Sequence, residues 1–321
     1  MSEATAVDLR TLSMPVSRGE WKRFCAEARA GHHGPDLADA SYIMRYGATL
    51  YTVMHLSLIA AVIGPLALSG ELRHLREEGG ILYLGGILVW IAAWTLVGVL
   101  LRPHSWWVRA RARYRLHRFV TANGIRHEAE APLGRRPGVV FEGTGVHRRH
   151  RDWCVVPGPT GFEIANYHAE DADASQNDMH WSEDWGYAVF ALRGSYPRTL
   201  VSDRLSRPWP PKKLEKAEPV PLPGAHRLRM RSTKPHYPAL TALLSADLLA
   251  VLEAVRPVPV VEIVGDELHL YARGSFDFAL PGTWRTVLGI RDVLAPHLSC
   301  PANVTDLAHR TRTGEVRELE R

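Results

Sequence analysis

The chain has 321 residues and a formal net charge of +5, and its mean hydropathy of −0.14 is that of an ordinary soluble protein. This length allows one or two domains. The basic excess lies almost entirely in residues 102–127, which hold seven arginines and no acidic residue, whereas residues 128–321 hold 24 basic and 25 acidic residues. A nucleic-acid-binding domain carries basic residues over its folded surface, so this charge distribution excludes nucleic acid as an expected partner.

The N-terminal segment, residues 1–46, is expected to contain a short amphipathic helix in residues 17–31. Ser17 and Glu20 have the spacing of a capping box at the start of a helix. Four apolar residues recur on one face at helical spacing: Trp21, Phe24, Cys25 and Ala28. The opposite face mixes both charge signs, so we expect the apolar face to pack against protein rather than to lie on a membrane.

Two apolar stretches follow, residues 47–69 and 79–101, and neither contains a charged residue. Each exceeds the ~20 apolar residues that span the hydrocarbon core of a bilayer. We interpret them as two transmembrane helices. The link between them, residues 70–78, is short and forces an antiparallel hairpin, so residues 47–101 are expected to form a transmembrane hairpin.

Residues 102–127 are expected to continue the second span as a basic helix at the membrane surface. Arginines in a short segment beside a span mark the cytoplasmic side, which predicts a multi-pass protein of the inner (plasma) membrane with both termini in the cytoplasm. Tryptophan prefers the interface, and each arginine near anionic headgroups contributes about 1 kcal/mol. The expected membrane-interface residues are Trp106, Trp107, Arg109, Arg111, Arg113, Arg115 and Arg118.

The pattern then changes to strands, and residues 128–300 are expected to form a soluble domain. Short runs rich in β-branched and aromatic residues, separated by Gly, Pro and Asp, are typical of antiparallel sheet. The predicted strands are residues 138–143, 152–156, 162–168 and 185–193. Residues 207–224, with six prolines in 18 residues, are expected to be an exposed loop or extended linker rather than a helix.

The last part of the domain is predicted to hold a helix in residues 245–255, a hairpin in residues 260–273 with its turn at Gly265-Asp266, and a helix near residues 283–298. Residues 301–321 have the composition of a polar tail. Strands followed by helices in this order indicate an α+β fold. The chain is therefore expected to join a two-helix transmembrane hairpin to a mostly antiparallel α+β cytoplasmic domain.

Three stretches carry a resemblance to a known family: WGYAVFALRGSYPRTLVSDR, the stretch from YPALTALL to LHLYAR, and FALPGTWRTVLGIRDVL. They resemble a family of uncharacterised two-span membrane proteins of actinobacteria, in which a domain of unknown function follows the spans. The resemblance covers roughly residues 40–300. It implies the same anchored architecture, and it implies no particular activity, cofactor or catalytic residue.

The acidic loop at residues 168–184 is the strongest candidate for a metal site. Four oxygen-bearing side chains have the odd-position spacing of a calcium-binding loop: Asp171, Asp173, Ser175 and Asn177. However, Gln176 stands where that loop needs glycine, and Ser182 stands where it needs glutamate. His168 and His180 could join the carboxylates around a transition metal, but a long stretch of loop separates them. We interpret the loop as a solvated connection between two strands.

A second candidate is a Cys–His nucleophile pair formed by His147 or His150 with Cys154. Cys154 opens an apolar strand, which predicts burial, and no third, orienting residue stands nearby. The other cysteines, Cys25 and Cys300, are distant, and the odd total argues against a disulfide framework and fits a reducing compartment. None of the common catalytic or nucleotide-binding motifs occurs, so no catalytic, cofactor or metal-binding residue is predicted.

These observations favour a membrane-anchored cytoplasmic domain that binds or regulates another protein. Its expected partners are a bilayer with anionic headgroups and either a protein partner or a second copy of the chain. The alternative is a membrane-tethered enzyme whose site is assembled from scattered residues. A deep pocket with converging His, Asp or Arg side chains would favour the enzyme, and a flat apolar patch would favour the binding module.

Overall fold

The computed structural model describes residues 7–33, 108, 110–131, 136–142, 146–170, 182–203 and 212–299. The chain divides into two compact units, one formed by Met1–Met14 with Arg115–Arg321 and one formed by Pro15–Tyr114. In the part of the chain that is described, no helix is both long enough and apolar enough to cross a bilayer. The two predicted spans, residues 47–69 and 79–101, lie outside the described residues.

The smaller unit contains helix α2, Arg18–Arg29, which confirms the predicted amphipathic helix. The Ser17 hydroxyl accepts a hydrogen bond from the Glu20 N–H at 3.2 Å and donates one to the Glu20 carboxylate at 2.8 Å, so this pair caps the helix start. The apolar face packs against the beginning of the helix at residues 110–122. The cluster consists of Phe24, Cys25, Ala28, Ala110 and Tyr114.

The larger unit is built on a seven-stranded sheet in the described residues, and every strand pairing in it is antiparallel. The strands are β1 (Arg126–Ala131), β2 (Val146–Val156), β3 (Phe162–Glu170), β4 (Ser182–Ser202), β5 (Val220–Pro221), β6 (Arg229–Ser232) and β7 (Val260–Arg273). Strands β1 to β4 are successive neighbours. The end of β4 pairs with β6, while β7 pairs with both halves of β4. The predicted mostly antiparallel α+β fold is confirmed for this unit.

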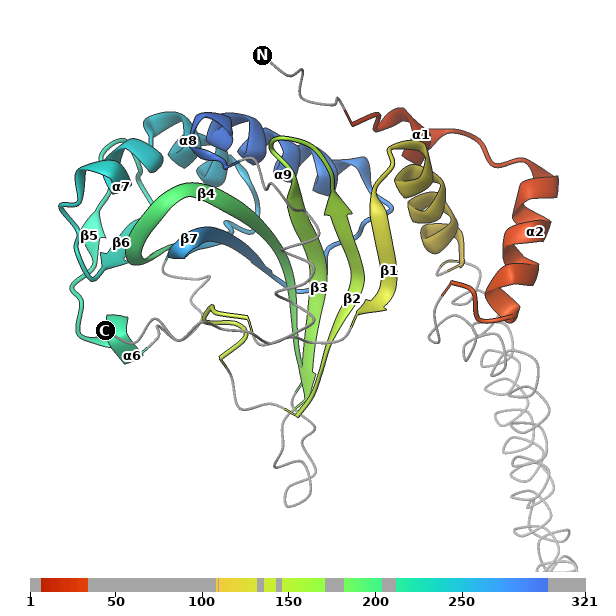
Figure 1. Cartoon of the computed structure of the whole chain (residues 1–321), viewed down its shortest axis with the longest axis horizontal. Coiled ribbons are helices and arrows are strands. Elements are labelled where there is room, and N and C mark those ends of the chain that lie inside the picture. Colours follow the sequence, from red (N-terminus) through yellow and green to blue (C-terminus); the bar gives the residue numbers. More distant parts are fainter. Residues whose placement is uncertain are drawn as a thin grey trace, which may run out of the picture. The chain divides into compact units, whose positions relative to one another are not determined.

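Helices cover the convex face of the curved sheet (Figure 1). They are α7 (Pro238–Leu243), α8 (Ala246–Ala254) and α9 (Pro281–Leu294), followed by the short 3-10 helix η1 (Ala295–His297). Apolar side chains of these helices, such as Leu248 and Trp284, bury against strand residues such as Ile164 and Phe190. The predicted helices at 245–255 and 283–298 are therefore confirmed, and Ser245 caps α8 by accepting from the Leu248 N–H.

The chain's beginning also belongs to this unit. Helix α1, Arg10–Ser13, places Leu12 in the convex-side core. The Asp8 N–H donates to Asn123 Oδ1 at 2.6 Å. The helix at residues 110–122 is closed by Gly124 at φ 60°, a left-handed conformation that favours glycine. Arg126 and His127, which were predicted to belong to the basic helix, therefore begin strand β1.

Two element predictions are wrong because local patterns were outweighed by long-range pairing and burial. Residues 260–273 form one continuous strand rather than a hairpin, since each half of β7 finds its partner along the 21-residue β4. Gly265 (φ 62°) forms a bulge where the β4 register shifts around Tyr196. The proline-rich stretch contains the short helix α6 (Lys212–Glu215) and strand β5, because Leu214 is drawn into a fully buried position.

The predicted strand at residues 138–143 is also absent: the described part, residues 138–142, is a turn. The Gly138 carbonyl accepts hydrogen bonds from the N–H groups of Phe141 and Glu142, at 2.9 and 3.0 Å. Gly138 adopts φ 129°, which ordinary residues avoid. The apolar run is buried by insertion against the concave face of the sheet rather than by strand alternation.

Candidate binding site on the concave face of the sheet

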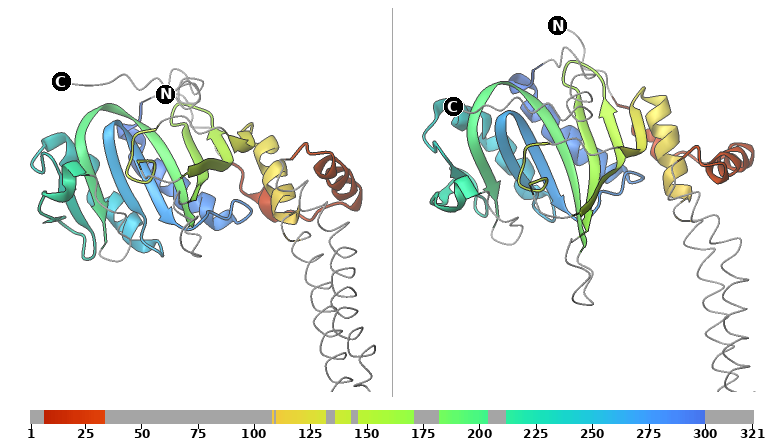
Figure 2. Two further views of the ribbon diagram at one scale, coloured as in Figure 1. Left: turned by 90° about the horizontal axis from the view of Figure 1, so that it is seen from below. Right: turned by 60° about the horizontal axis from the view of Figure 1, so that its bottom comes forward.

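Residues 136–142, called the inserted segment below, cross the concave face of the sheet (Figures 1 and 2). None of the strand ladders among the described residues includes them. Arg136, Val140 and Phe141 are nevertheless buried, with at most 9% of each residue exposed. The segment is therefore held mainly by its side chains, and the sheet residues that hold it form the candidate site.

An ion pair attaches the first residue of the inserted segment. The Arg136 guanidinium donates Nη1 to Glu163 Oε1 at 2.6 Å and Nη2 to Glu163 Oε2 at 2.7 Å. The two side chains are 4% and 0% exposed. Strand β3 turns Phe162 and Ile164 toward the convex-side core, so Glu163 between them faces the concave side. Two parallel N–H···O bonds of this kind are the geometry in which a guanidinium and a carboxylate pair most specifically.

A buried chain of hydrogen bonds continues from Glu163. The Tyr187 hydroxyl on β4 donates to Glu163 Oε1 at 2.8 Å and lies 2.8 Å from His150 Nδ1 on β2. Because the only tyrosine proton goes to the carboxylate, the imidazole must donate from Nδ1. That leaves His150 Nε2 as an acceptor, and it is buried without a hydrogen-bond partner among the described residues.

Burial controls the protonation of this network. Burial lowers the pKa of His150 to about 4, against the opposing attraction of Glu163 and with help from the Arg136 charge, so the imidazole is neutral at pH 7. Burial and the Glu163 charge both raise the pKa of Tyr187, which keeps its hydroxyl protonated. Burial alone would lower the pKa of Arg136, but the facing Glu163 carboxylate reverses the sign and raises it.

A second carboxylate holds the middle and the end of the inserted segment. Glu262 Oε2 on β7 accepts from the Val139 N–H at 2.6 Å and from the Tyr271 hydroxyl at 3.1 Å. Glu262 Oε1 accepts from Arg198 at 2.8 Å, and Arg198 also reaches Glu142 Oε1 at 2.7 Å. The segment therefore meets opposite charge at both ends: Arg136 against Glu163, and Glu142 against Arg198.

The ring of Phe141 lies inside a cage of five rings. Its centroid is 5.1 to 6.1 Å from those of Tyr187, Tyr167, Tyr271, His150 and His269. All five contacts have interplanar angles of 60–89°, the edge-to-face arrangement that ring quadrupoles favour. We call these five residues the aromatic cage.

Gly138 permits the backbone to approach the cage. A Cβ atom at this position would lie 2.3 Å from the Tyr271 hydroxyl oxygen, so any side chain would collide with the cage. His269 lies beside Tyr271 on β7, with the two rings stacked at 5.9 Å, and it is completely buried. Its Nε2 lies 3.0 Å from Glu267 Oε2 but outside hydrogen-bond geometry, and neither ring nitrogen forms a hydrogen bond among the described residues.

The predicted membrane-interface residues have different positions. Trp106, Trp107 and Arg109 lie outside the described residues. Arg111 and Arg115 are exposed and Arg113 is half-buried. Arg118 is used by the fold, because its guanidinium donates to the carbonyl oxygens of Thr11 and, at 2.7 Å, Met14.

The two chemical candidates from the sequence do not form a site in the described residues. Strand β2 places His150 in the aromatic cage and Cys154 in the convex-side core, so they face opposite sides and cannot form a nucleophile pair. Residues 171–181 of the acidic loop lie outside the described residues, and at its border His168 Nδ1 contacts Asp184 Oδ1 at 2.8 Å. The described residues contain no group of three or more His, Cys, Asp or Glu able to hold a metal ion.

Sequence reasoning missed the residues that matter most here, but a signal for some was present. Glu163 interrupts the apolar stretch FEIA, and Glu262 interrupts VVEIV. Charged residues in such strands are almost never fully buried unless they are paired. An acidic residue that alternates with core residues therefore indicates a buried charge partner. The cage members and Arg136 could not be identified this way, because they come together only in the folded sheet.

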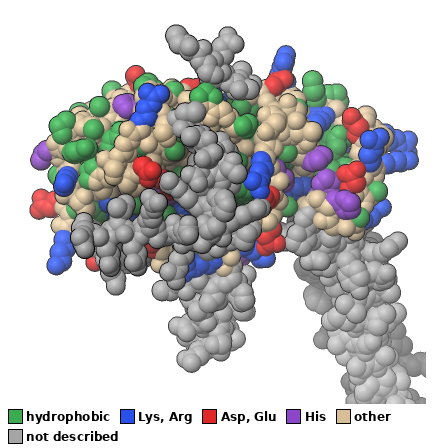
Figure 3. All heavy atoms as spheres, viewed as in Figure 1, with side chains coloured by type: hydrophobic (Ala, Val, Ile, Leu, Met, Phe, Trp, Pro, Cys, Tyr) green, Lys and Arg blue, Asp and Glu red, His purple; other side chains and the backbone are tan. Residues whose placement is uncertain are grey.

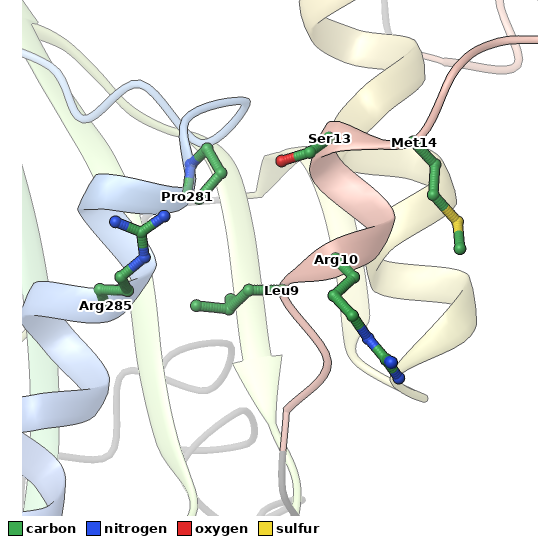
Figure 4. A pocket seen from close by; sticks show the side chains of 6 residues that line it. All are labelled: Leu9, Arg10, Ser13, Met14, Pro281 and Arg285. Carbon is green, nitrogen blue, oxygen red and sulfur yellow. The ribbon is translucent and has the colours of Figure 1, made fainter.

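Two further cavities are lined by residues in the described part of the chain. One, of about 350 Å³, separates α1 from the start of α9 and is lined by Leu9, Arg10, Ser13, Met14, Pro281 and Arg285. Figure 4 shows that Leu9 points toward α9 whereas Arg10 points away from it, and Arg10 is paired with Asp8. The other, of about 340 Å³, lies beside Arg273 and Asp277 at the start of α9. Neither gathers an acid–base pair comparable to the concave-face network.

The face shown in Figure 3 has acidic and basic side chains interspersed over its described part, without a single large basic patch. This agrees with the nearly balanced charge of residues 128–321. Comparisons with protein-family models, with curated proteins and with solved structures found no match. The resemblance to the two-span actinobacterial family therefore stays an expectation, and the candidate site is interpreted from its own geometry.

Proposed function

We propose that this chain is a membrane-anchored, cytoplasmically facing binding module whose concave sheet face recognises a segment of polypeptide. The observation that carries the proposal is the way the inserted segment occupies that face. A charged side chain, a backbone N–H and an aromatic ring each meet a dedicated partner, while strand pairing plays no part. Peptide-binding domains combine the same elements: an anchor residue in a pocket, with polar groups that fix orientation.

A membrane-tethered enzyme is the second candidate, because His150, Tyr187 and Glu163 form a buried hydrogen-bonded chain. Reacting groups must lie within hydrogen-bond reach of a substrate. The ring of Phe141 packs edge-to-face against the rings of both His150 and Tyr187, which are hydrogen-bonded to each other. This favours recognition over chemistry at the concave face.

The membrane anchor in this proposal rests on the charge-free stretches 47–69 and 79–101 and on the arginines that follow them. A C-terminal alkaline phosphatase fusion tests the orientation, because that reporter is active only outside the cytoplasm. Low activity, with high activity of a matched fusion within residues 70–78, is the expected result. High activity at the C-terminus would contradict the cytoplasmic assignment.

Partner binding is tested by photo-crosslinking in intact cells. A photoreactive residue at Glu142, which is exposed beside the concave face, should capture a discrete protein partner. The matched control places the same residue at Arg285, which is exposed on α9 at the opposite face. Equal capture at both positions, or capture at neither, would contradict a binding site on the concave face.

A further inference from the structure

We propose that the inserted segment is an exchangeable ligand held in cis, and that a partner protein displaces it with a segment of matching chemistry. The matching segment carries an arginine, an aromatic residue five positions after it, and an acidic residue directly after the aromatic one. The aromatic ring must carry a hydrogen-bond donor, as the rings of tyrosine and tryptophan do. This inference rests on the proposed function and specifies its ligand.

The charges of the site define the ends of this ligand. Glu163 is completely buried and takes a guanidinium through two hydrogen bonds. Arg198 pairs with the acidic residue at the other end. Between them, Glu262 accepts one backbone N–H. A lysine would replace only part of the first interaction, because its ammonium group lacks the planar two-donor fork of arginine.

The resident segment does not satisfy all the groups that it covers. His150 Nε2 and His269 Nδ1 are buried without hydrogen bonds among the described residues, whereas His269 Nε2 lies 3.0 Å from Glu267 Oε2. An unsatisfied buried polar atom is unfavourable because it has lost its hydrogen bonds to water without gaining new ones. Phe141 cannot relieve this cost because its ring has no donor. A ring with a hydroxyl or indole N–H can donate to one of these nitrogens, and so gains binding energy that the resident segment lacks.

The same observation argues against a second copy of the chain as the occupant. The segment of another copy would leave the same imidazole nitrogens unsatisfied, so exchange between copies gains no contact over the cis arrangement. The resident segment also competes at a high effective concentration, because it is covalently attached. A partner segment therefore needs better chemistry, which the donor-bearing ring supplies.

Binding is tested with the purified full chain in detergent and the fluorescent peptide Arg-Pro-Gly-Val-Val-Tyr-Glu. Phe141→Ala removes the resident ring from the cage. Phe278→Ala is the matched control, because Phe278 is equally buried but lies in the convex-side core. The expected result is peptide binding at least about tenfold tighter to Phe141→Ala than to the wild type or the control, since the open fraction rises. Adding Glu163→Gln should abolish this gain.

Two further results decide the ligand chemistry. The same peptide with phenylalanine in place of tyrosine should bind Phe141→Ala more weakly, and equal affinity would overturn the donor requirement. If Phe141→Ala unfolds, the tyrosine peptide should raise its thermal midpoint, because a ligand that binds only the native state stabilises it. If the peptide neither binds Phe141→Ala nor stabilises it, the proposal is overturned.

Exchange in the wild type is tested by amide hydrogen exchange. The Val139 N–H should exchange faster than the Ile164 N–H of the central sheet, because opening of the segment requires less than global unfolding. Equal protection of the two amides would mean that the segment is a permanent part of the core, and would overturn the proposal.

Light scattering of Phe141→Ala tests which molecule occupies the site. A dimer that the peptide dissociates would indicate a second copy of the chain and would overturn the assignment to a partner protein. If the peptide binds but no protein is crosslinked at residue 142 in cells, the proposed cellular function is contradicted, whereas the proposed peptide site is supported.

Discussion

The Arg136 guanidinium and the Glu163 carboxylate are joined by two hydrogen bonds of 2.6 and 2.7 Å in a setting almost closed to solvent. A buried pair of this kind loses the hydration of both charges, and its net contribution depends on complete pairing. Here Tyr187 donates a further hydrogen bond to the same carboxylate. The ion pair therefore fixes the position of the inserted segment relative to β3.

Removing one member of this pair should destabilise the domain strongly. Arg136→Met leaves the Glu163 charge buried without its guanidinium, and Glu163→Gln does the reverse, so each should lower the free energy of unfolding by about 3–5 kcal/mol. The double variant should lose much less than the sum, because neither charge is left alone. Denaturant unfolding of all four proteins measures this coupling. Additive losses would show that the two side chains do not interact in the folded protein.

Gly138 should tolerate no side chain while the Tyr271 hydroxyl is present. Gly138→Ala should destabilise by about 2 kcal/mol or more, since backbone strain adds to the collision with the hydroxyl. Tyr271→Phe removes the oxygen that lies 2.3 Å from the new Cβ, so the loss should be smaller in that background.

Gly224 is the control for this effect, because it also has a positive φ, 81°, but nothing lies within 4 Å of an added Cβ. Gly224→Ala should show the backbone strain alone, about 1 kcal/mol. Thermal or denaturant unfolding provides both values. A loss at Gly138 that matches the loss at Gly224 would contradict close packing of the inserted segment on the cage.

The sequence predicts the parts of this fold that depend on local chemistry. Ser17 and Ser245 stand at helix starts because their hydroxyls accept early N–H groups, and the structure has both caps. Runs such as 162–168 and 185–193 become strands because their alternate residues are apolar and bulky. The observed strands are longer than predicted, since β4 pairs with β7 on both sides of the polar residues around Gly194.

Features that depend on distant partners could not be predicted. Gly265-Asp266 has the composition of a hairpin turn, and only the length of β4 decides that it becomes a bulge. This bulge places Glu262 and Glu267, five residues apart, on the same face. Likewise, Val140 and Phe141 have a strand-like composition, and the cage that buries them is assembled from four strands. Arg136 was unremarkable in sequence because its partner lies on β3.

The stability of the domain should fall as the pH drops from about 6.5 to about 4. His150 has a pKa of about 4 in the folded state, against 6.5 for an unperturbed histidine. Between these two pH values, His150 is therefore protonated in the unfolded chain but neutral in the folded chain. Above pH 6.5 the imidazole is neutral in both states and has no effect. The difference corresponds to about 3 kcal/mol at pH 4, at about 1.4 kcal/mol per unit of pKa.

A control separates His150 from other titrating groups. His150→Gln removes the titrating imidazole, so denaturant unfolding at a series of pH values should show a shallower decline for this variant. His236, which is exposed on the same unit, provides a matched substitution, His236→Gln, that should leave the wild-type slope unchanged. The same slope in all three proteins would rule out His150 as the group responsible.

Two arginines of the basic helix should have opposite importance for folding. Arg118 donates to the carbonyl oxygens of Thr11 and Met14 and thereby ties the chain's beginning to the helix. Hydrogen bonds from a charged donor contribute about 1.5–3 kcal/mol each, although partial exposure reduces this here, so Arg118→Ala should destabilise by about 1–3 kcal/mol. Arg115 is exposed on the same helix, and Arg115→Ala should change stability by less than about 0.5 kcal/mol.

Denaturant unfolding compares the stability of the two variants, and a protease should cleave within the first 14 residues faster in Arg118→Ala. Equal effects of the two substitutions would mean that Arg118 does not hold the N-terminal segment. Arg118 would then be available, like Arg115, to contact lipid headgroups.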